Sequence, residues 1–403
     1  MSLVQSISRF PKAPTPSQAQ ALQFLQEKGF PTKKDENWKY TSLKSWVEKS
    51  YVWAHSEGLK PNLESSLPQR AVFVNGCFKP ELSKLPAGVS FETSLRKNHP
   101  EDAFEALSAT IADQVNVLKF APRTQLEKPF EVLWIALGKQ ETSFFASTLR
   151  IEVGAESSVT LLERSVQQDQ LESFTTLQTE LHLGSRAKAE YVQIQDYNLR
   201  SFHYSKTQIE LAENSNFTSL VVALGALQSR SEFEVNIRGS GAEARTLGLY
   251  ALSESQQSDH YTRIRHHVGG SHSDQVYKGV LDGKSRGVFN GHVYIAQDAQ
   301  KGNSEQLNMN LLLSPQAEIN SKPELKIFAD DVKASHGSTI GQLQSEELFY
   351  LQSRGIKRGP ATQLLAQAFV MDLVERLENA ELRTRVSQSL VQKLAQFEGI
   401  RNL

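Results

Sequence analysis

The sequence predicts a mainly β protein, a parallel β-helix flanked by helical regions at both ends of the chain. Short alternating runs rich in β-branched residues dominate positions 130–332, where long amphipathic helices are absent. A strand–turn–strand pattern repeats there at drifting intervals of 26 to 30 residues. Apolar stripes with helical spacing begin after residue 345. We therefore divide the chain into regions 1–70, 71–128, 129–344 and 345–403.

Region 1–70 is predicted to be mostly helical. Ser17 is suited to cap a helix that Gly29 ends. The segment 35–41, Asp-Glu-Asn-Trp-Lys-Tyr-Thr, carries neighbouring aromatic side chains and suits a site that packs against another element. The apolar face of the first helix comprises Ala21, Leu22 and Leu25.

Region 71–128 is a mixed connecting segment. A strand is expected near Ala71 to Val74, just before the single cysteine, Cys77. A helix is expected from Asp102 to Val115, because apolar residues recur there at helical spacing. Those residues are Phe104, Leu107 and Ile111.

Region 129–344 carries the repeat. Each unit is a short strand, a four-residue polar turn and a second strand. One such unit cannot bury its own apolar face, whereas stacked units bury a continuous core, which favours a parallel β-helix. A β-sandwich of ordinary hairpins is the competing interpretation. The first strands of four units begin at Ile151, Leu181, Ile209 and Val235, and the second strands at Val159, Ala189, Phe217 and Glu243.

Region 345–403 is predicted to be helical. Ser345 is suited to cap a first helix, Gly355 to end it, and Pro360 to open the next. The apolar stripes that follow either pack on the body of this protein, or part of a stripe is offered to a partner. The stripes comprise Leu365, Phe369, Leu373 and Leu377, then Leu382, Val386, Leu390 and Leu394.

Composition narrows the class of protein. A net charge of −1 predicts no general attraction to nucleic acid or an anionic membrane. Cys77 alone cannot form an internal disulfide or hold a four-thiolate cluster, and it favours a cytoplasmic location. Residues 1–16 lack the pattern of a secretory signal, and the strongest apolar stretches are too short to cross a bilayer.

Sequence motifs favour binding over catalysis. The chain has no phosphate-binding loop, no dinucleotide fingerprint and no G-x-S-x-G or H-E-x-x-H motif. An alternative is a polysaccharide-active β-helix enzyme using Asp330 and Asp331, although neighbouring strand residues would face opposite sides. A second alternative is a cupin-type metal site formed by three histidines, whose spacing matches no strong ligand signature. These histidines are His266, His267 and His272.

A further histidine, His336, lies in the stretch 330–343, Asp-Asp-Val-Lys-Ala-Ser-His-Gly-Ser-Thr-Ile-Gly-Gln-Leu. This stretch, with Leu-Phe-Tyr-Leu-Gln-Ser-Arg-Gly-Ile at 348–356, resembles the C-terminal signature of the SufB/SufD family. The segment 36–41 resembles an N-terminal landmark of that family. The glycine after His336 is similar to the SufD branch, and Ala334 stands where SufD chains often have cysteine.

The resemblance implies a right-handed parallel β-helix and a non-catalytic scaffold for iron–sulfur cluster assembly. It implies pairing with SufB through the β-helices, with a homodimer as the alternative without SufB. It implies docking of the ATPase SufC on the C-terminal helices, with Phe349, Tyr350, Arg354 and Gly355 as candidate contacts. His336 would lie at the SufB interface and share a metal or transient cluster with SufB. No cofactor is expected to bind stably to this chain alone, and a reduced flavin is associated with the complex.

Overall fold

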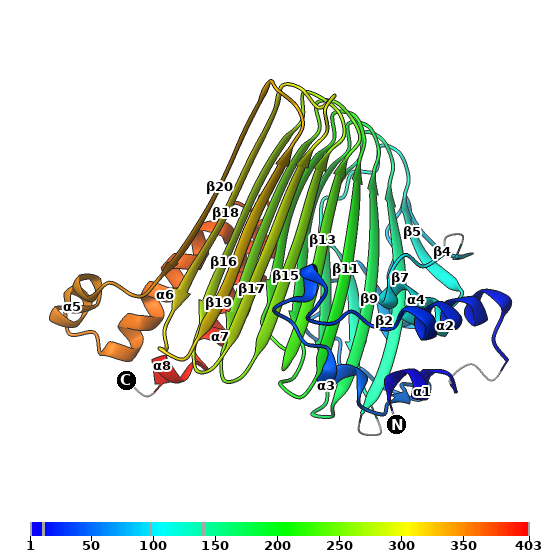
Figure 1. Cartoon of the computed structure of the whole chain (residues 1–403), viewed down its shortest axis with the longest axis horizontal. Coiled ribbons are helices and arrows are strands. Elements are labelled where there is room, and N and C mark those ends of the chain that lie inside the picture. Colours follow the sequence, from blue (N-terminus) through cyan, green and yellow to red (C-terminus); the bar gives the residue numbers. More distant parts are fainter. Residues whose placement is uncertain (1, 10–12, 97–98, 139–141, 402–403) are drawn as a thin grey trace.

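Two parallel sheets form the body of the protein (Figure 1). The computed structural model describes residues 2–9, 13–96, 99–138 and 142–401. Successive long strands alternate between the sheets, so each coil contributes one strand to each. Sheet A contains β1 (Val52–Trp53), β4 (Val89–Leu95), β5 (Gln114–Phe120), β7 (Ser143–Val153), β9 (Ser173–Leu183), β11 (Phe202–Leu211), β13 (Gln228–Ile237), β15 (Gln257–His266), β17 (Arg286–Ile295) and β19 (Glu318–Ile327). Sheet B contains β2 (Arg70–Val74), β3 (Cys77–Phe78), β6 (Phe130–Ala136), β8 (Ser158–Gln167), β10 (Lys188–Asp196), β12 (Asn216–Ala223), β14 (Glu243–Leu252), β16 (His272–Leu281), β18 (Gly302–Leu312) and β20 (Val332–Gly341).

The sequence repeat corresponds to the stacking of coils. Ile151 pairs with Leu181, which pairs with Ile209, which pairs with Val235 in the next coil. Every pairing from β5 to β20 is parallel, so the β-helix prediction is confirmed and the hairpin sandwich is wrong.

The second strand of the fourth repeat unit differs from the prediction by one residue, because the repeat places Glu243 level with Phe217. Phe217 pairs with Ala244 rather than with Glu243. The turn before β14 is one residue longer than its counterparts and includes Gly241 at φ +71°, a backbone conformation that suits glycine. A fixed repeat length therefore misplaces the strand that follows this turn.

The interior changes from aromatic to polar along the β-helix. Near β2, Phe73 stacks on Trp134 with ring centroids 4.1 Å apart, and both are buried. Near β18, buried amides form hydrogen bonds instead: Gln306 Nε2 donates to Gln275 Oε1 at 2.6 Å. Asn308 Nδ2 donates to the Tyr250 hydroxyl at 3.1 Å. The two ends of the core therefore have different chemistry.

The N-terminal segment covers the outer face of sheet A. Its helices are α1 (Leu3–Ile7), α2 (Pro16–Lys28) and α3 (Lys44–Val47), with the 3-10 turn η1 (Glu36–Trp38). A second 3-10 turn, η2 (Pro80–Leu82), follows β3 and packs against β2 of sheet B instead. Thr15, not Ser17, caps α2, because Pro16 fits the first helical position and Gln18 completes a capping box with Thr15. Gly29 ends this helix at φ +67°, as expected. Helix content in region 1–70 is smaller than predicted, since long irregular segments join these short helices.

The helix predicted from Asp102 to Val115 ends earlier. Helix α4 spans Ala103–Ile111, and Asp102 caps it by accepting from the backbone N–H groups of Phe104 and Glu105. Val115 instead lies in β5 and is buried in the sheet. Its β-branched side chain suits a strand better than a helix.

The C-terminal helices are α5 (Ser345–Ser353), α6 (Arg358–Val374), α7 (Ala380–Leu394) and α8 (Glu398–Arg401). Ser345 is the first residue of α5 rather than its cap, since the N-cap is Gln344 and makes no side-chain cap bond. Pro360 lies in the first turn of α6 but does not open it. No helix among the described residues is both long and apolar enough to span a membrane.

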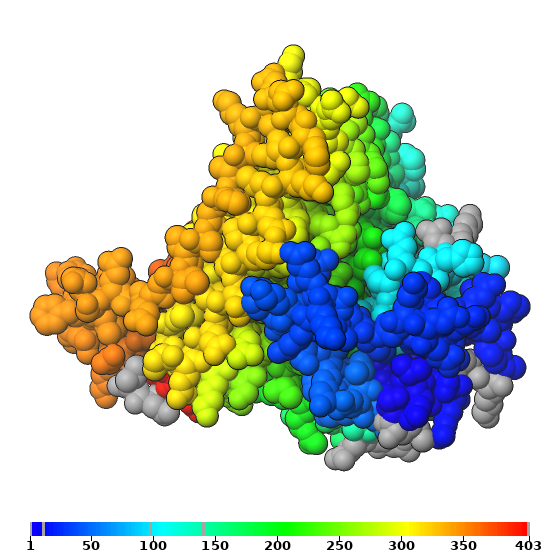
Figure 2. Space-filling model, viewed as in Figure 1, coloured from blue at the N-terminus to red at the C-terminus, as the bar shows by residue number. Residues whose placement is uncertain are grey.

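Helices α6, α7 and α8 pack their apolar stripes on the outer face of sheet B. Val370 and Leu390, for example, are buried in one cluster with Leu220 and Leu247 of the sheet. Of the two interpretations of these stripes, packing on the body is confirmed for all their residues except Leu365, which is half-buried and lies outside this cluster. Helix α5 instead projects away from the body, at the other end of the view from α1 and α2 (Figure 1 and Figure 2).

Candidate functional site

The two ends of the β-helix are built differently. At the first end, β3 and β4 turn back antiparallel to β2 and β5 and cover the end of the core, where Phe78 stacks on Phe91 with centroids 3.6 Å apart. Cys77 lies exposed in this hairpin. At the other end, β19 and β20 each pair on one side, and no further strand joins them within the described residues. An unpaired edge strand presents a row of free N–H and C=O groups that another chain can pair with.

His336 lies on β20 at this open end. It pairs in register with the buried Gln306 below it and is itself exposed. Val332 and Ala334 pack against the core between the sheets, so His336 lies on the same side of the strand. A cavity of about 570 Å³ is lined by His336 together with residues of β17 and β19 such as Leu325. The imidazole is therefore accessible at the mouth of the β-helix.

The other histidine group does not form a metal site. His266 is buried, and both ring nitrogens contact serine hydroxyls, Nδ1 at 2.8 Å from Ser271 and Nε2 at 2.8 Å from Ser273. Burial lowers the pKa of His266 to about 4. His267 Nε2 instead contacts Asn236, and His272 is exposed on β16. The described residues contain no group of three or more His, Cys, Asp or Glu side chains placed to hold a metal ion. The cupin-type interpretation is wrong, because the fold is a β-helix.

Asp330 and Asp331 lie exposed in the bend between β19 and β20. Neither is part of a strand, so the argument that they face opposite sides of one does not apply. The backbone N–H of Asp331 donates to Gln300 Oε1 at 2.8 Å, which anchors the bend. This position indicates a corner of the coil rather than a sugar-binding groove.

The candidate partner contacts gather on and just after α5. Phe349 and Tyr350 are 71% and 58% exposed, unusually high for large apolar side chains. The Arg354 guanidinium lies 5.3 Å from the centroid of the Tyr350 ring, and Gly355 ends the helix region at φ +85°. The apolar surface of α5 is thus free, whereas the stripes of α6 and α7 are covered.

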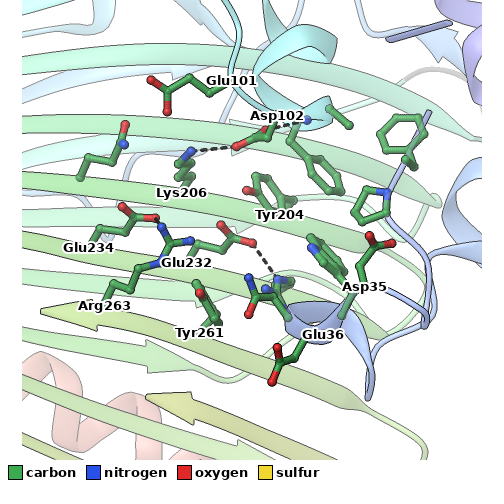
Figure 3. A pocket seen from close by; sticks show the side chains of 18 of the residues that line it. Asp35, Glu36, Glu101, Asp102, Tyr204, Lys206, Glu232, Glu234, Tyr261 and Arg263 are labelled. Atoms are coloured by element: carbon green, nitrogen blue, oxygen red, sulfur yellow. Dashed lines mark hydrogen bonds and ion pairs between the residues drawn. The ribbon is translucent and has the colours of Figure 1, made fainter. Parts of the chain in front are cut away.

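The N-terminal motif forms part of a pocket that sequence reasoning missed. Trp38 is buried and stacks on Phe104 of α4 with centroids 5.5 Å apart, so the packing expected for segment 35–41 is confirmed. The Thr41 hydroxyl donates to Asp259 of β15. Between this segment, the start of α4 and the outer face of sheet A lies a cavity of about 1080 Å³ (Figure 3).

Charged side chains form the floor of this pocket. Arg230 of β13 is 1% exposed and donates through Nε to Glu232 at 2.9 Å and through Nη1 to Asp259 at 2.5 Å. Burial alone lowers the pKa of Lys206, but its ion pairs with Asp102 and Glu105 outweigh that effect and raise the pKa above its usual value. A signal was present in the sequence, since polar and apolar side chains alternate along residues 232–236. The partners on the N-terminal segment were not visible there.

The architecture is that of a β-solenoid protein with one closed end, one open end and helices on two faces. Residues 135–369 match the family model described as "SUF system FeS cluster assembly, SufBD core domain". This chain belongs to the SufBD family of iron–sulfur cluster assembly proteins.

Relatives agree along nearly the whole chain. The Escherichia coli iron–sulfur cluster assembly protein SufD is 31% identical over 396 residues, which covers 94% of this chain and 93% of that protein. A SufBD family protein of Synechocystis is 31% identical over 89% of this chain and 86% of its own length. The chloroplastic protein ABCI7 of Arabidopsis thaliana is 27% identical over 95% of this chain and 87% of its own length.

Proposed function

We propose that this protein is a non-catalytic scaffold subunit for iron–sulfur cluster assembly that pairs with SufB and docks the ATPase SufC. The observation that carries this proposal is the open end, where β19 and β20 each leave a ten-residue edge unpaired among the described residues. SufB would complete these edges with strands of its own β-helix. In the absence of SufB, two copies of this chain would pair through the same edges.

His336 is the proposed contact with the cluster. It is exposed on the edge strand β20, where a partner strand would lie beside it. One imidazole supplies one ligand, whereas iron–sulfur clusters use several, so thiolates of SufB would supply the others. Ala334 contributes no thiolate. A cluster shared in this way is held transiently, as cargo of the complex rather than as a cofactor of this chain.

SufC would dock on α5. The stripes of α6 and α7 are mostly buried against sheet B, and the most exposed large apolar side chains of the C-terminal region are Phe349 and Tyr350. The reduced flavin would belong to the assembled complex, and we assign no residue of this chain to it. The single cysteine favours a reducing, cytoplasmic location for this work.

Reconstitution tests this proposal directly. The full chain would be mixed with SufB, SufC, ferrous iron and sulfide, and cluster formation followed by visible absorbance. We expect His336→Ala to leave the complex intact on gel filtration and to reduce cluster formation at least about tenfold. The matched control is His272→Ala, which removes an exposed histidine from a paired strand and should form clusters normally.

Two results would count against the proposal at different levels. Normal cluster formation by the His336 variant would remove the site assignment while leaving the scaffold role. Failure of the unmodified chain to associate with either SufB or SufC would overturn the scaffold role itself.

A further inference from the structure

The pocket under Trp38 contains a buried cationic group with an unused donor. Arg230 Nη2 has no hydrogen-bond partner, although the side chain is 1% exposed and lines the cavity. The guanidinium carbon lies 3.8 Å from the centroid of the Trp38 ring and 5.1 Å from that of the Tyr261 ring. Buried donors are nearly always satisfied, so this N–H is suited to an acceptor that enters from the pocket.

A second unused donor lies on the neighbouring strand. Arg263 Nε is buried and has no partner, while its Nη1 approaches Glu234 at 3.3 Å. Both arginines line the same cavity, and Figure 3 shows Arg263 beside Glu234 and Tyr261 on its floor. Guanidinium groups recognise planar oxyanions well, and a carboxylate matches their fork geometry.

The charge of the walls excludes a strongly anionic ligand. The pocket is lined by six lysines or arginines and seven aspartates or glutamates, so its net charge is close to zero. A polyphosphate would bring several negative charges against these carboxylates. A ligand whose anionic group is balanced by a cationic group of its own avoids this repulsion.

The cationic group of the ligand would lie beside the carboxylate of Glu232. Its side chain lies at the centre of the pocket in Figure 3, and Arg230 Nε contacts one of its oxygens, Oε1. Burial raises the pKa of Glu232, and the guanidinium of Arg230 only partly opposes this effect. A second cation beside the carboxylate would stabilise its charged form. Because Arg230 and Glu232 touch, the ligand's anionic and cationic groups must themselves be neighbours.

We propose that this pocket binds a free α-amino acid, with its carboxylate on Arg230 and its ammonium group on Glu232. An α-amino acid carries these two groups on one carbon, which matches adjacent protein partners. The cavity, at about 1080 Å³, leaves room for the ligand's side chain toward Trp38 and Tyr204. This site lies on the outer face of sheet A and borders the cavity at the open end, with which it shares Tyr261, Arg263 and Arg265. Its ligand has no part in the proposed scaffold role.

The test uses the purified full chain and isothermal titration with each of the common α-amino acids. Matched probes are the N-acetyl and the carboxamide form of whichever amino acid binds, together with inorganic phosphate. We expect at least one amino acid to bind with a dissociation constant below about 1 mM, and each blocked form to bind at least tenfold more weakly. Binding of phosphate alone, or of no amino acid, would overturn the proposal.

Two variants locate the site. Glu232→Gln keeps the shape of the side chain but loses its charge, and should weaken binding at least tenfold. Arg230→Lys keeps the charge but loses the guanidinium fork, and should weaken it similarly. Glu318→Gln, an exposed carboxylate on β19 outside this cavity, should bind normally. If Arg230→Lys fails to fold, Glu232→Gln decides alone, and unchanged binding by that folded variant contradicts the assignment.

Discussion

The closed and open ends of the β-helix solve the same problem in opposite ways. Both are ends of the same two sheets, and each must deal with unpaired backbone groups. The closed end uses antiparallel strands and an aromatic core around Phe73 and Trp134. The open end has ten-residue edge strands, a polar interior and His336 at its rim. The difference teaches that the core is covered by strands of the same chain at the first end, whereas at the second end it is suited to being covered by another chain.

The largest expected effect is at the closed end. Phe73→Ala should lower the free energy of unfolding by about 3–5 kcal/mol, because it leaves a cavity beside Trp134 in a fully buried site. Phe328→Ala near the open end should cost less than about 1 kcal/mol, since Phe328 is half exposed. Urea unfolding of both variants measures the contrast. Equal losses would mean that the two ends are equally packed.

The second effect is on assembly rather than stability. Ile340→Lys places a charge on the edge strand β20, where the side chain is 54% exposed, and should weaken pairing with SufB about tenfold, or ~1.4 kcal/mol. The matched control is Leu95→Lys on β4 at the closed end, 67% exposed, which should leave pairing unchanged. Light scattering of the mixtures reports both. If Leu95→Lys disrupts pairing instead, the assignment of the interface is reversed.

A smaller difference in stability is expected between capping variants of α2 and α5, the helices near the two ends. Thr15→Ala removes the hydroxyl that caps α2 and should destabilise the protein by about 1 kcal/mol. Ser345→Ala should have little effect, because α5 has no side-chain cap to lose. Thermal unfolding compares them, and a cost for Ser345→Ala as large as that for Thr15→Ala would show that α5 depends on this hydroxyl after all.

The smallest expected effect is on how the free energy of unfolding depends on pH, through Glu163 near the closed end. Burial raises the pKa of Glu163, although hydrogen bonds from Tyr191 and Trp134 oppose it. The native state therefore holds this proton more tightly than the unfolded chain does. Stability from this group is present below the unfolded pKa, near 4.5, and is lost as pH rises through the folded pKa.

Glu163→Gln mimics the protonated acid and removes this loss. The difference in free energy of unfolding, variant minus unmodified protein, should therefore rise between pH 4.5 and 8. Urea titrations at several pH values measure it. A difference that stays constant over this range would show that Glu163 keeps an ordinary pKa inside the core.

Sequence reasoning was strongest where one physical rule dominates. The apolar period along Ile151, Leu181 and Ile209 predicted the coil register, because each buried position must stack on the next. It failed at Glu243, where an added turn residue shifts the strand. Caps were misassigned because a hydroxyl near a helix start need not belong to the residue just before the first turn. Thr15, not Ser17, holds that position for α2, and Ser345 already lies inside α5.

The two candidate sites also differ in whether a single continuous stretch of sequence identifies them. His336 was identified from a motif that is continuous in the sequence, and its exposure on an edge strand follows from its place in the last coil. The pocket under Trp38 brings together segments almost 200 residues apart, Trp38 and Arg230 among them. No local pattern encodes such an approach, because it depends on how the N-terminal segment folds back over the sheet.

The path of the chain after β20 has a mechanical consequence. In an ordinary solenoid the terminal repeat peels away first, because it has a single neighbour. Here the residues that follow the last strand run back across sheet B, and Lys393 Nζ bonds Gln256 at 2.7 Å while the Gly399 N–H bonds Asp282 at 2.9 Å. These hydrogen bonds hold the C-terminal helices to residues next to β15 and β16, so the final coil cannot separate from the stack on its own. The edge strands β19 and β20 can therefore remain unpaired, and available to a partner, without unfolding. Amide hydrogen exchange in β20 should report how strongly the C-terminal helices hold the final coil.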